Sequence, residues 1–472
     1  MAYQKNWPTL LAYALAVIGF FVAAAYAVMY ATGYRIDFES WTVQKTGVLA
    51  ITTKPSGATV ILNDSQLARK TPFTLRNALP GPYHIKLTLA GYQPYEKDVE
   101  VLSSQATEEH NVDLVLAEIK STTVAEKLTA VLNIDNDIWA FDWNKQFVKI
   151  GDPTSPLGFD KMPTNVKTVL TQATGLYLAK KHPNSNDIAL GAMVGSKRWL
   201  VIADPFGYRG QLFGAPFNQV SAEKLFWIDA DRLMLLIGSS IYTIDLNLNQ
   251  TNLYAKSVTG ATYDNGRAYY VTKNSHGQVT LYSDGNLFDD KSAEVAFDNV
   301  PVASSHEIMV TPEETIILLT DNRSSRGLWL IDKDPKAKSP EYQLTKLASG
   351  VYNTLYDYLN EQLFFVQDKT VSAYDTTKRT TQKLRQFIDT PTLVGKRNES
   401  VFIQSQNKFW IGDPSLSNVY EIVSATNTTL LLGSDSKRVW TLKDGQLLEW
   451  VLRNPGQGVF GVLPNWVGRV SG

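Results

Sequence analysis

The chain has 472 residues, with 45 basic and 46 acidic side chains, 44% hydrophobic residues and no cysteine. This length predicts about three domains, and the ordinary hydrophobic and charged content indicates folded rather than disordered protein. The balanced charge, without a basic block, disfavours a nucleic-acid partner. The lack of cysteine excludes disulfides, thiol catalysis, iron–sulfur clusters and cysteine-bound zinc. The five histidines do not occur at HxxxH or HxH spacing, so the sequence supports neither a metal site nor any other cofactor.

The N-terminal region contains a long uncharged segment. Twenty-nine residues between Lys5 and Arg35 carry no charge, and 10–31 is almost wholly apolar. At about 1.5 Å per residue, this stretch can span a hydrocarbon core about 30 Å thick. We therefore expect residues 1–35 to form a short cytoplasmic tail and an uncleaved transmembrane anchor, with a linker over 36–46. A cleaved signal peptide is the alternative, because small residues near Ala23 have A-x-A spacing, although the apolar region of such a peptide runs only about 7–15 residues.

The charges that flank this segment predict its orientation. Lys5 and the amino terminus lie on one side, whereas the other side mixes signs at Arg35, Asp37, Glu39 and Lys45. The positive-inside bias then favours a cytoplasmic N-terminus. We therefore expect a single-pass protein of the plasma membrane whose C-terminal domains are extracytoplasmic.

Residues 47–117 predict a small all-β domain. Gly47–Thr52, Ala58–Leu62, Tyr83–Leu89 and Tyr95–Val101 are short alternating runs, and a further strand is expected over 111–116. Turn residues separate these runs, because Pro fixes φ and Gly or Asn permits conformations that other residues avoid. We expect a β-sandwich of about seventy residues.

The order of the turn residues resembles the PEGA domain family. The turn motifs, in order, are Pro55-Ser56-Gly57-Ala58, Thr71-Pro72, Pro80-Gly81 and Gly91-Tyr92, and a Gly-x-Leu-x-Ile strand precedes them. Ser56 replaces the Glu of the family name, and the turn 63–65 lacks the usual Gly. The resemblance implies a small β-sandwich found near bacterial and archaeal surfaces, often appended to other domains. It implies no catalytic residue, and it covers only about 15% of the chain.

One phrase recurs through the rest of the chain: an apolar strand that ends in an Asp-containing turn. The phrases are VKIGDP, LVIADP, IYTIDL, TLYSDG, LWLIDK, VSAYDT, FWIGDP and WTLKDG, with Asp at positions 152, 204, 245, 284, 332, 375, 413 and 444. The mean spacing is about 42 residues, although the last gap is only 31. A second apolar strand precedes most phrases, and we expect each such pair to form the middle hairpin of a blade.

A repeat of 40–45 residues built from strands is typical of a β-propeller with one four-stranded blade per repeat. We expect residues 121–465 to form seven or eight blades, without a convincing helix. The rhythm resembles WD-repeat-like and Tol-B-like propellers, but the Trp-Asp and Gly-His pairs of true WD repeats are missing. The predicted fold class is therefore all-β: a transmembrane helix, a PEGA-like sandwich and a propeller.

The candidate chemical groups favour structural roles. Asp residues at strand ends are expected to accept backbone N–H bonds in the next turn. The acidic pairs Asp135/Asp137 and Asp229/Asp231 lack the twelve-residue calcium loop, so we expect turns there. The densest acidic loop is Asp284-Gly285-Asn286 with Asp289-Asp290, where calcium binding is the less favoured alternative. Ser239-Ser240 follows Gly238 in a predicted hairpin rather than a nucleophile elbow. Tryptophans in or beside the repeating strands are expected to stabilise blade packing rather than bind sugars; these are Trp139, Trp143, Trp199, Trp329, Trp410 and Trp440.

These observations predict a binding or scaffold protein of the bacterial cell envelope, not an enzyme. The expected partner is a protein or a cell-envelope glycan, held by propeller loops on a rigid scaffold. The alternative is a glycosidase or lyase at the mouth of the propeller channel, which would need two converging carboxylates about 5–10 Å apart. A spacer without a specific ligand is a third hypothesis. The sequence assigns no catalytic, cofactor-binding or metal-binding residue.

Overall fold

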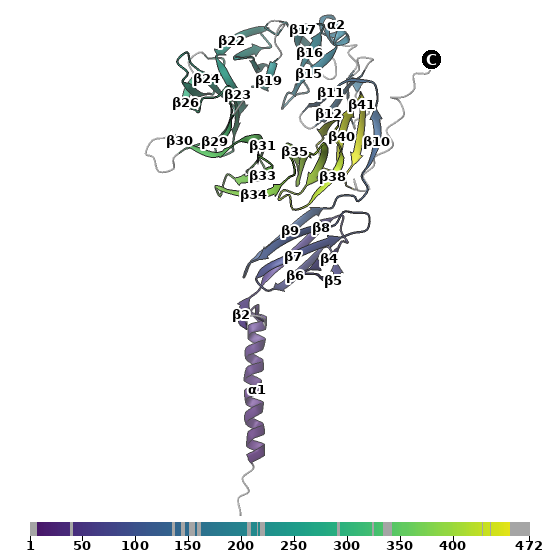
Figure 1. Ribbon diagram of the computed structural model, residues 1–472, viewed down its shortest axis with the longest axis vertical. Coiled ribbons are helices and arrows are strands. Elements are labelled where there is room, and N and C mark those ends of the chain that lie inside the picture. The colour runs from purple at the N-terminus through teal and green to yellow at the C-terminus, as the bar shows by residue number, and fades with distance from the viewer. Residues whose placement is uncertain are drawn as a thin grey trace, which may run out of the picture. The chain divides into compact units, whose positions relative to one another are not determined.

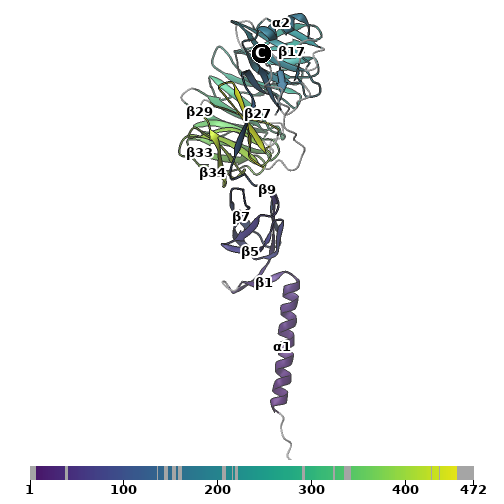
Figure 2. The ribbon, with the colours of Figure 1, turned by 90° about the vertical axis from the view of Figure 1, so that its right-hand side faces the viewer.

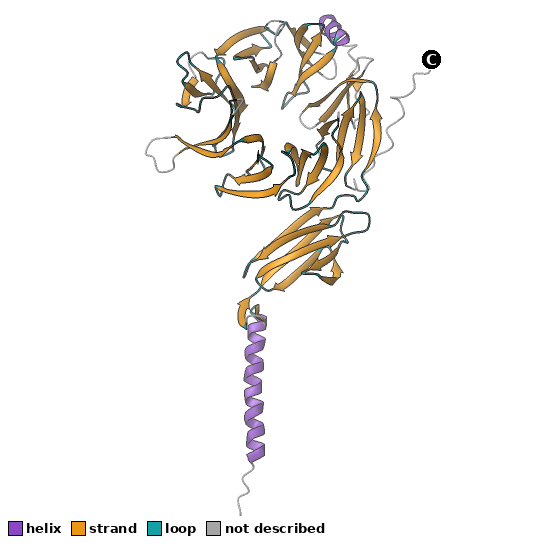
Figure 3. Cartoon of the chain, in the orientation of Figure 1, coloured by secondary structure: helices purple, strands orange, loops and turns teal. Residues whose placement is uncertain are grey.

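The computed structural model describes residues 7–453, apart from 38–40, 135–136, 143–146, 151–155, 158–161, 205–208, 215, 218–221, 290–292, 323–324, 334–341, 427 and 435. The chain divides into two compact units, residues 1–118 and 119–472. Strands dominate both units, and the predicted all-β class with one N-terminal apolar helix is confirmed (Figure 3).

The N-terminal helix α1 (Trp7–Ala31) is apolar on every side. Its segment Leu11–Ala31 has a mean hydropathy of 2.2 and is not buried by other parts of the protein. The helix is long enough to cross a membrane, and a signal sequence would meet the same criterion. Gly33 ends the helix with φ of +83°, and its N–H donates to the Tyr30 carbonyl. This is a left-handed cap that glycine adopts without steric cost.

A β-hairpin follows the helix within the segment predicted to be a linker. Strand β1 (Tyr34–Asp37) pairs antiparallel with β2 (Thr42–Lys45). The buried Thr46 fixes the hairpin to the helix cap, because its N–H and its hydroxyl both donate to the Gly33 carbonyl, at 2.9 and 2.8 Å. The region between helix and sandwich is therefore folded where the structure describes it.

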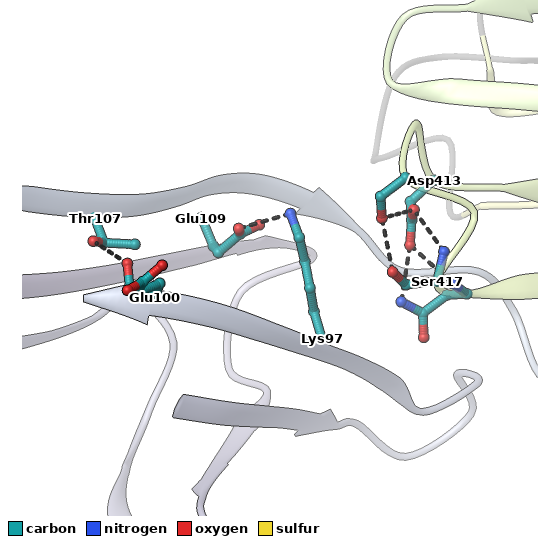
Figure 4. A network of polar contacts seen from close by, with 8 residues as sticks. Lys97, Glu100, Thr107, Glu109, Asp413 and Ser417 are labelled. Atoms are coloured by element: carbon teal, nitrogen blue, oxygen red, sulfur yellow. Dashed lines mark hydrogen bonds and ion pairs between the residues drawn. The ribbon is translucent and has the colours of Figure 1, made fainter. Parts of the chain in front are cut away.

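The small domain is a sandwich of two sheets. One has the order β6-β3-β9, and the other has the order β5-β4-β7-β8. The strands are β3 (Gly47–Lys54), β4 (Thr59–Leu62), β5 (Ser65–Lys70), β6 (Phe73–Ala78), β7 (Gly81–Thr88), β8 (Tyr95–Val101) and β9 (Ala106–Asp113). The alternating residues of β3 and β7 point inward and form a core with Leu49, Ile51, Ile85 and Leu87 fully buried. Lys97 of one sheet pairs with Glu109 of the other at 2.7 Å (Figure 4).

The turn residues of this domain make specific hydrogen bonds. The buried Thr71 hydroxyl accepts the Ala58 N–H at 3.0 Å and lies 2.5 Å from the Thr53 hydroxyl. These hydrogen bonds connect the Thr71-Pro72 turn to the Pro55-Ser56-Gly57-Ala58 turn. Asn63 and Asp64 take positive φ values of 46° and 64° in the two-residue β4–β5 hairpin, so these residues replace the missing glycine. Strand β5 was not predicted, because its polar sequence at the sheet edge has no apolar alternation.

Within its described residues, the larger unit is a propeller of eight four-stranded sheets, the higher of the two predicted blade numbers. We number the blades in chain order. Blades 1 to 4 contain β11 (Leu128–Ile134), β12 (Asp137–Asp142), β13 (Phe147–Lys149), β14 (Pro156–Leu157); β15 (Gly175–Lys181), β16 (Ile188–Val194), β17 (Lys197–Ala203), β18 (Gly210–Phe213); β19 (Ala222–Trp227), β20 (Arg232–Ile237), β21 (Ser240–Asp245), β22 (Gln250–Lys256); β23 (Val258–Asp264), β24 (Arg267–Lys273), β25 (Val279–Asp284), β26 (Ala293–Phe297).

Blades 5 to 8 follow the same plan until the ring closes. They contain β27 (Ser305–Val310), β28 (Ile316–Asp321), β29 (Arg326–Lys333), β30 (Tyr342–Ser349); β31 (Val351–Asp357), β32 (Gln362–Gln367), β33 (Thr370–Asp375), β34 (Thr380–Gln386); β35 (Thr392–Arg397), β36 (Ser400–Ser405), β37 (Lys408–Gly412), β38 (Val419–Ser424); β39 (Thr429–Leu432), β40 (Arg438–Lys443), β41 (Gln446–Val451) and β10 (Lys120–Ala125). The first strand of each blade lies toward the centre of the ring (Figure 1), and Figure 2 shows the blades from the side.

The ring closes with a strand from its own N-terminus. β10 pairs with β41, so blade 8 has the order β10-β41-β40-β39. This arrangement explains the short final repeat. Asp444 follows the second strand of its blade, whereas Asp245 and Asp375 end the third strand. The prediction that each phrase ends a middle hairpin is therefore wrong for the last blade.

The expectation of no helix after residue 121 is also wrong. Helix α2 (Thr164–Gln172) lies between blades 1 and 2 and starts after Pro163. It buries Val166, Val169 and Leu170, which the i, i+3, i+4 spacing places on one face. The cluster they join also contains Phe141 and Val201 of the two neighbouring blades. Nine residues give too short a helical pattern to stand out among strands.

Candidate functional site

The propeller presents two faces that differ in their loops. Because each blade is an antiparallel meander beginning at the inner strand, the described blade-to-blade connectors and the described turns between second and third strands lie on one face. We call this the connector face. The other face, which we call the hairpin face, carries the turns after the first and third strands.

Side-chain contacts between neighbouring blades fix the inner strands. Lys224 of blade 3 donates to the Ala261 carbonyl of blade 4 at 3.3 Å. The Thr259 hydroxyl of blade 4 lies 2.8 Å from His306 of blade 5. Similar contacts join blades 2 and 3, 6 and 7, 7 and 8, and 8 and 1, through Trp227, Lys396, Arg397 and Asn133. The connector face is therefore carried by a rigid scaffold.

A polar cleft of about 190 Å³ opens on the connector face between blades 5 and 6. Its lining comes from the start of two inner strands, β27 and β31, and from the end of β28 and the start of β29. The lining residues are Ser305, Glu307, Leu319, Asp321, Arg326, Tyr352, Asn353 and Thr354. The cleft thus combines both charge signs, an amide, hydroxyls and an aromatic ring.

Arg326 holds the two walls of this cleft together. Its Nε and one terminal nitrogen bind the same Asp321 carboxylate oxygen at 2.8 and 2.7 Å. Its other terminal nitrogen donates to the Tyr352 carbonyl of the next blade at 2.8 Å. The Arg326 side chain is 42% exposed and the Asp321 side chain 29% exposed, so the pair remains partly accessible. On the other side, the Asn353 side chain accepts the Leu393 N–H at 2.7 Å, which links blade 6 to blade 7.

Exposed apolar side chains lie at three successive blade junctions of the connector face. Val302, Tyr352 and Ile388 belong to the junctions from blade 4 to 5, 5 to 6 and 6 to 7, and they are 54%, 49% and 73% exposed. We call these three residues the apolar rim. Sequence analysis did not find the cleft or the rim, because each residue is unremarkable in its own segment.

The Asp residues at strand ends behave as predicted in most described blades. Asp245 accepts the N–H groups of residues 247 and 248 at 3.0 and 2.9 Å, and Asp284 and Asp375 accept equivalent bonds in their turns. Asp413 accepts from the backbone of 417 and 418 (Figure 4). Asp332 differs, since the Thr315 hydroxyl of the preceding strand donates to it at 2.6 Å. Asp152 lies outside the described residues.

The other predicted candidates also have structural partners. Asp229 accepts the Asp231 N–H at 3.0 Å, which makes this acidic pair a turn. Asp284, close to the acidic loop 289–290, is fully buried and accepts the Tyr254 hydroxyl. Asp135 and Asp290 lie outside the described residues. Within the described chain, the side chains of His, Asp and Glu do not gather in threes around a possible metal position.

The tryptophans of the repeat contribute to blade packing. The Trp329 indole donates to the Thr320 hydroxyl at 3.2 Å, and the Trp410 indole donates to the Ser405 carbonyl at 3.1 Å. Both partners lie on the adjacent strand of the same blade. Trp143 lies outside the described residues. Ser239 and Ser240 occupy the β20–β21 hairpin, as predicted.

Among the described carboxyl groups, Asp264 has a raised pKa, and its cause is burial. Asp264 ends the first strand of blade 4 and therefore lies at the hairpin face, away from the cleft. In the cleft itself, the carboxylate of Asp321 is paired with Arg326. The cleft is thus arranged around an ion pair.

Comparison with protein families identifies the small domain. Residues 46–119 match the PEGA domain model, so the resemblance predicted from the turn residues is confirmed. The chain therefore carries a PEGA domain next to a propeller and an apolar N-terminal helix. No curated protein matches the sequence.

Solved structures with some similarity include three proteins from different organisms. BamB from Moraxella catarrhalis is 12% identical with a TM-score of 0.42, and the match covers 73% of this chain and all of that one. YCF48 from Cyanidioschyzon merolae is 11% identical with a TM-score of 0.39, covering 58% and 95%. Dipeptidyl peptidase 4 from Porphyromonas gingivalis is 10% identical with a TM-score of 0.46, covering 67% and 56%. The chain thus spans little more than half of that peptidase, and no ligand or activity is carried over.

Proposed function

We propose that this chain is a single-pass, membrane-anchored binding protein whose extracytoplasmic propeller holds a protein partner on its connector face. The observation that carries the proposal is the apolar rim: Val302, Tyr352 and Ile388 lie on successive junctions beside a polar cleft. Interfaces combine apolar and aromatic contacts with a few polar groups that set orientation. The cleft supplies those groups through Arg326 and Asn353.

The rim favours a protein over a sugar as partner. Its three residues lie at three successive blade junctions, and two of them are aliphatic side chains that cannot stack on a sugar ring as an aromatic face does. The rigid inner ring supports this interpretation, because little conformational entropy is lost when a preformed surface binds. A glycan partner is an outcome that the experiment below distinguishes.

The anchoring part of the proposal depends on α1. Its uncharged length, the basic residue before it and the mixed charges after it favour insertion with the N-terminus in the cytoplasm. The PEGA domain supports a position at the cell surface. A chain without cysteine permits a direct topology test: Ser65→Cys, at the exposed start of β5, should react with a membrane-impermeant maleimide in intact cells. Reaction only after lysis would reverse the orientation.

Binding is tested with variants of the rim in the full-length protein. Tyr352→Ala with Ile388→Ala should reduce the partner recovered after cross-linking in membranes by at least tenfold. Leu248→Ala is the matched control, because it is 64% exposed on the hairpin face and should leave recovery unchanged. Sensitivity of the cross-linked species to protease or to glycan-degrading enzyme identifies the partner's class. Equal recovery from all variants would contradict the proposed face.

A further inference from the structure

The hairpin β1–β2 has two faces of opposite character. In the register of the two strands, Tyr34 lies opposite Lys45 and Ile36 opposite Val43. Alternation along a strand places Tyr34, Ile36 and Val43 on one face, and Arg35 and Gln44 on the other. The first face is apolar except for a lysine whose long stem lets its charge reach water.

The polar face is turned toward the protein. Arg35 donates to the carbonyls of Tyr30 and Tyr34 at 3.1 and 2.8 Å, and its guanidinium lies 3.6 Å from the centre of the Tyr30 ring. With the Asn77 amide oriented to satisfy both of its ends, the Asn77 oxygen accepts a bond from Arg35 at 3.0 Å. Arg35 thus connects the hairpin to the helix end and to strand β6 of the sandwich.

The apolar face is exposed. Tyr34 is 40% exposed and Val43 is 55% exposed, and Trp41, the residue before β2, is 79% exposed. Exposing apolar side chains to water costs free energy. A cluster of exposed apolar side chains therefore indicates contact with a membrane or with another protein. Chain connectivity fixes which one, because β1 begins three residues after α1 ends and Thr46 bonds the helix cap.

The helix length places this face at the edge of a bilayer. Twenty-five residues at about 1.5 Å each extend about 37 Å, which exceeds a hydrocarbon core of about 30 Å. The C-terminal end of α1 therefore reaches the headgroup region, where tyrosine and tryptophan are favoured because they are apolar with one polar end.

We infer that the β1–β2 hairpin is a membrane-interface element: its apolar face, with Tyr34 and Val43, inserts among the lipid headgroups together with the neighbouring Trp41 and holds the sandwich next to the bilayer. This inference rests on the proposed anchoring by α1. The hairpin then adds a second contact to the helix, and it restricts how far the sandwich can tilt away from the membrane.

The test uses the absence of native cysteine in the full-length protein. Single-cysteine variants Trp41→Cys, Val43→Cys, Thr42→Cys and Ile18→Cys are labelled with an environment-sensitive fluorophore and reconstituted in phosphatidylcholine–phosphatidylglycerol vesicles. Quenching by lipids that carry a nitroxide near the headgroup is measured. Labels at 41 and 43 should be quenched at least twofold more than the label at 42, which lies between them on the polar face.

The label at Ile18, in the middle of α1, separates the two proposals. Quenching of this label by a nitroxide deep in the acyl chain supports anchoring. If Ile18 is quenched while 41 and 43 behave like 42 and are reached by iodide in water, the interface inference fails and anchoring stands. If Ile18 is itself unquenched in the vesicles, the anchoring proposal fails and the inference fails with it.

Discussion

Lys396 and Asp357 form an ion pair at 2.6 Å between the first strands of blades 6 and 7, and both side chains are nearly inaccessible, at 7% and 6% exposed. Burial alone would raise the pKa of Asp357, but hydrogen bonds from Lys396 and Asn360 outweigh it, and the net pKa is lowered. A charge removed from water requires a close partner, so the two residues depend on each other.

Lys396→Met should destabilise the propeller by roughly 3–5 kcal/mol, because it leaves the Asp357 carboxylate buried and unpaired. Lys408→Met is the matched control. Its pair with Glu421 has the same 2.6 Å distance but is 43% and 44% exposed, so its loss should cost at most about 1 kcal/mol. Urea unfolding of the full-length protein in detergent measures both. Equal effects would show that burial of the first pair contributes little.

His306 predicts a pH dependence of stability. Burial lowers the pKa of His306, and the positive charge of Lys273 lowers it further. The hydrogen bond to the Pro301 carbonyl raises the pKa, but the net pKa is lowered. Because the unfolded chain binds a proton near pH 6.5 and the folded chain only at lower pH, stability falls as pH decreases below about 6.5. In His306→Asn, the melting temperature between pH 7.5 and 5 should fall less steeply than in wild type. Parallel curves would assign the acid sensitivity to other groups.

At the scale of elements, the closure of the ring by β10 makes a direct prediction. Without β10, strand β41 loses one of its two antiparallel partners, keeps β40, and becomes an exposed edge. The fragment 119–472 should remain monomeric with a cooperative melting transition, whereas 127–472 should melt several degrees lower or aggregate. Size-exclusion chromatography and calorimetry compare them. Identical behaviour would mean that blade 8 is stable with three strands.

The sequence predicted the strands best where a local pattern determines them. The third strands of the blades were found because each combines an apolar run with an Asp that bonds the next turn, as in Asp245 and Asp375. Strand β5 and helix α2 were missed, because one is a polar edge strand and the other has three apolar residues in nine. In blade 8 the Asp-containing turn follows the second strand because β10 supplies the fourth strand. β10 lies more than 300 residues away in sequence, and no local pattern encodes that pairing.

At the scale of the whole molecule, the candidate site arises only from the closed ring. Arg326 meets Asp321 across the hairpin of its own blade, which is a local contact, but its bond to the Tyr352 carbonyl of the next blade does not follow from spacing along the chain. Sequence analysis could assign the binding role to propeller loops in general. The connector face could be singled out only in the folded ring, where the junctions of blades 4 to 7 lie next to one another.

The central claim is that the connector face between blades 5 and 7 contacts the partner. A photo-crosslinking amino acid placed at Ile388, and separately at Leu248, in the full-length protein within native membranes tests this most directly. We predict one discrete cross-linked species from position 388 and none from position 248, which lies on the hairpin face with similar exposure. The same species from both positions, or from position 248 alone, would contradict the account.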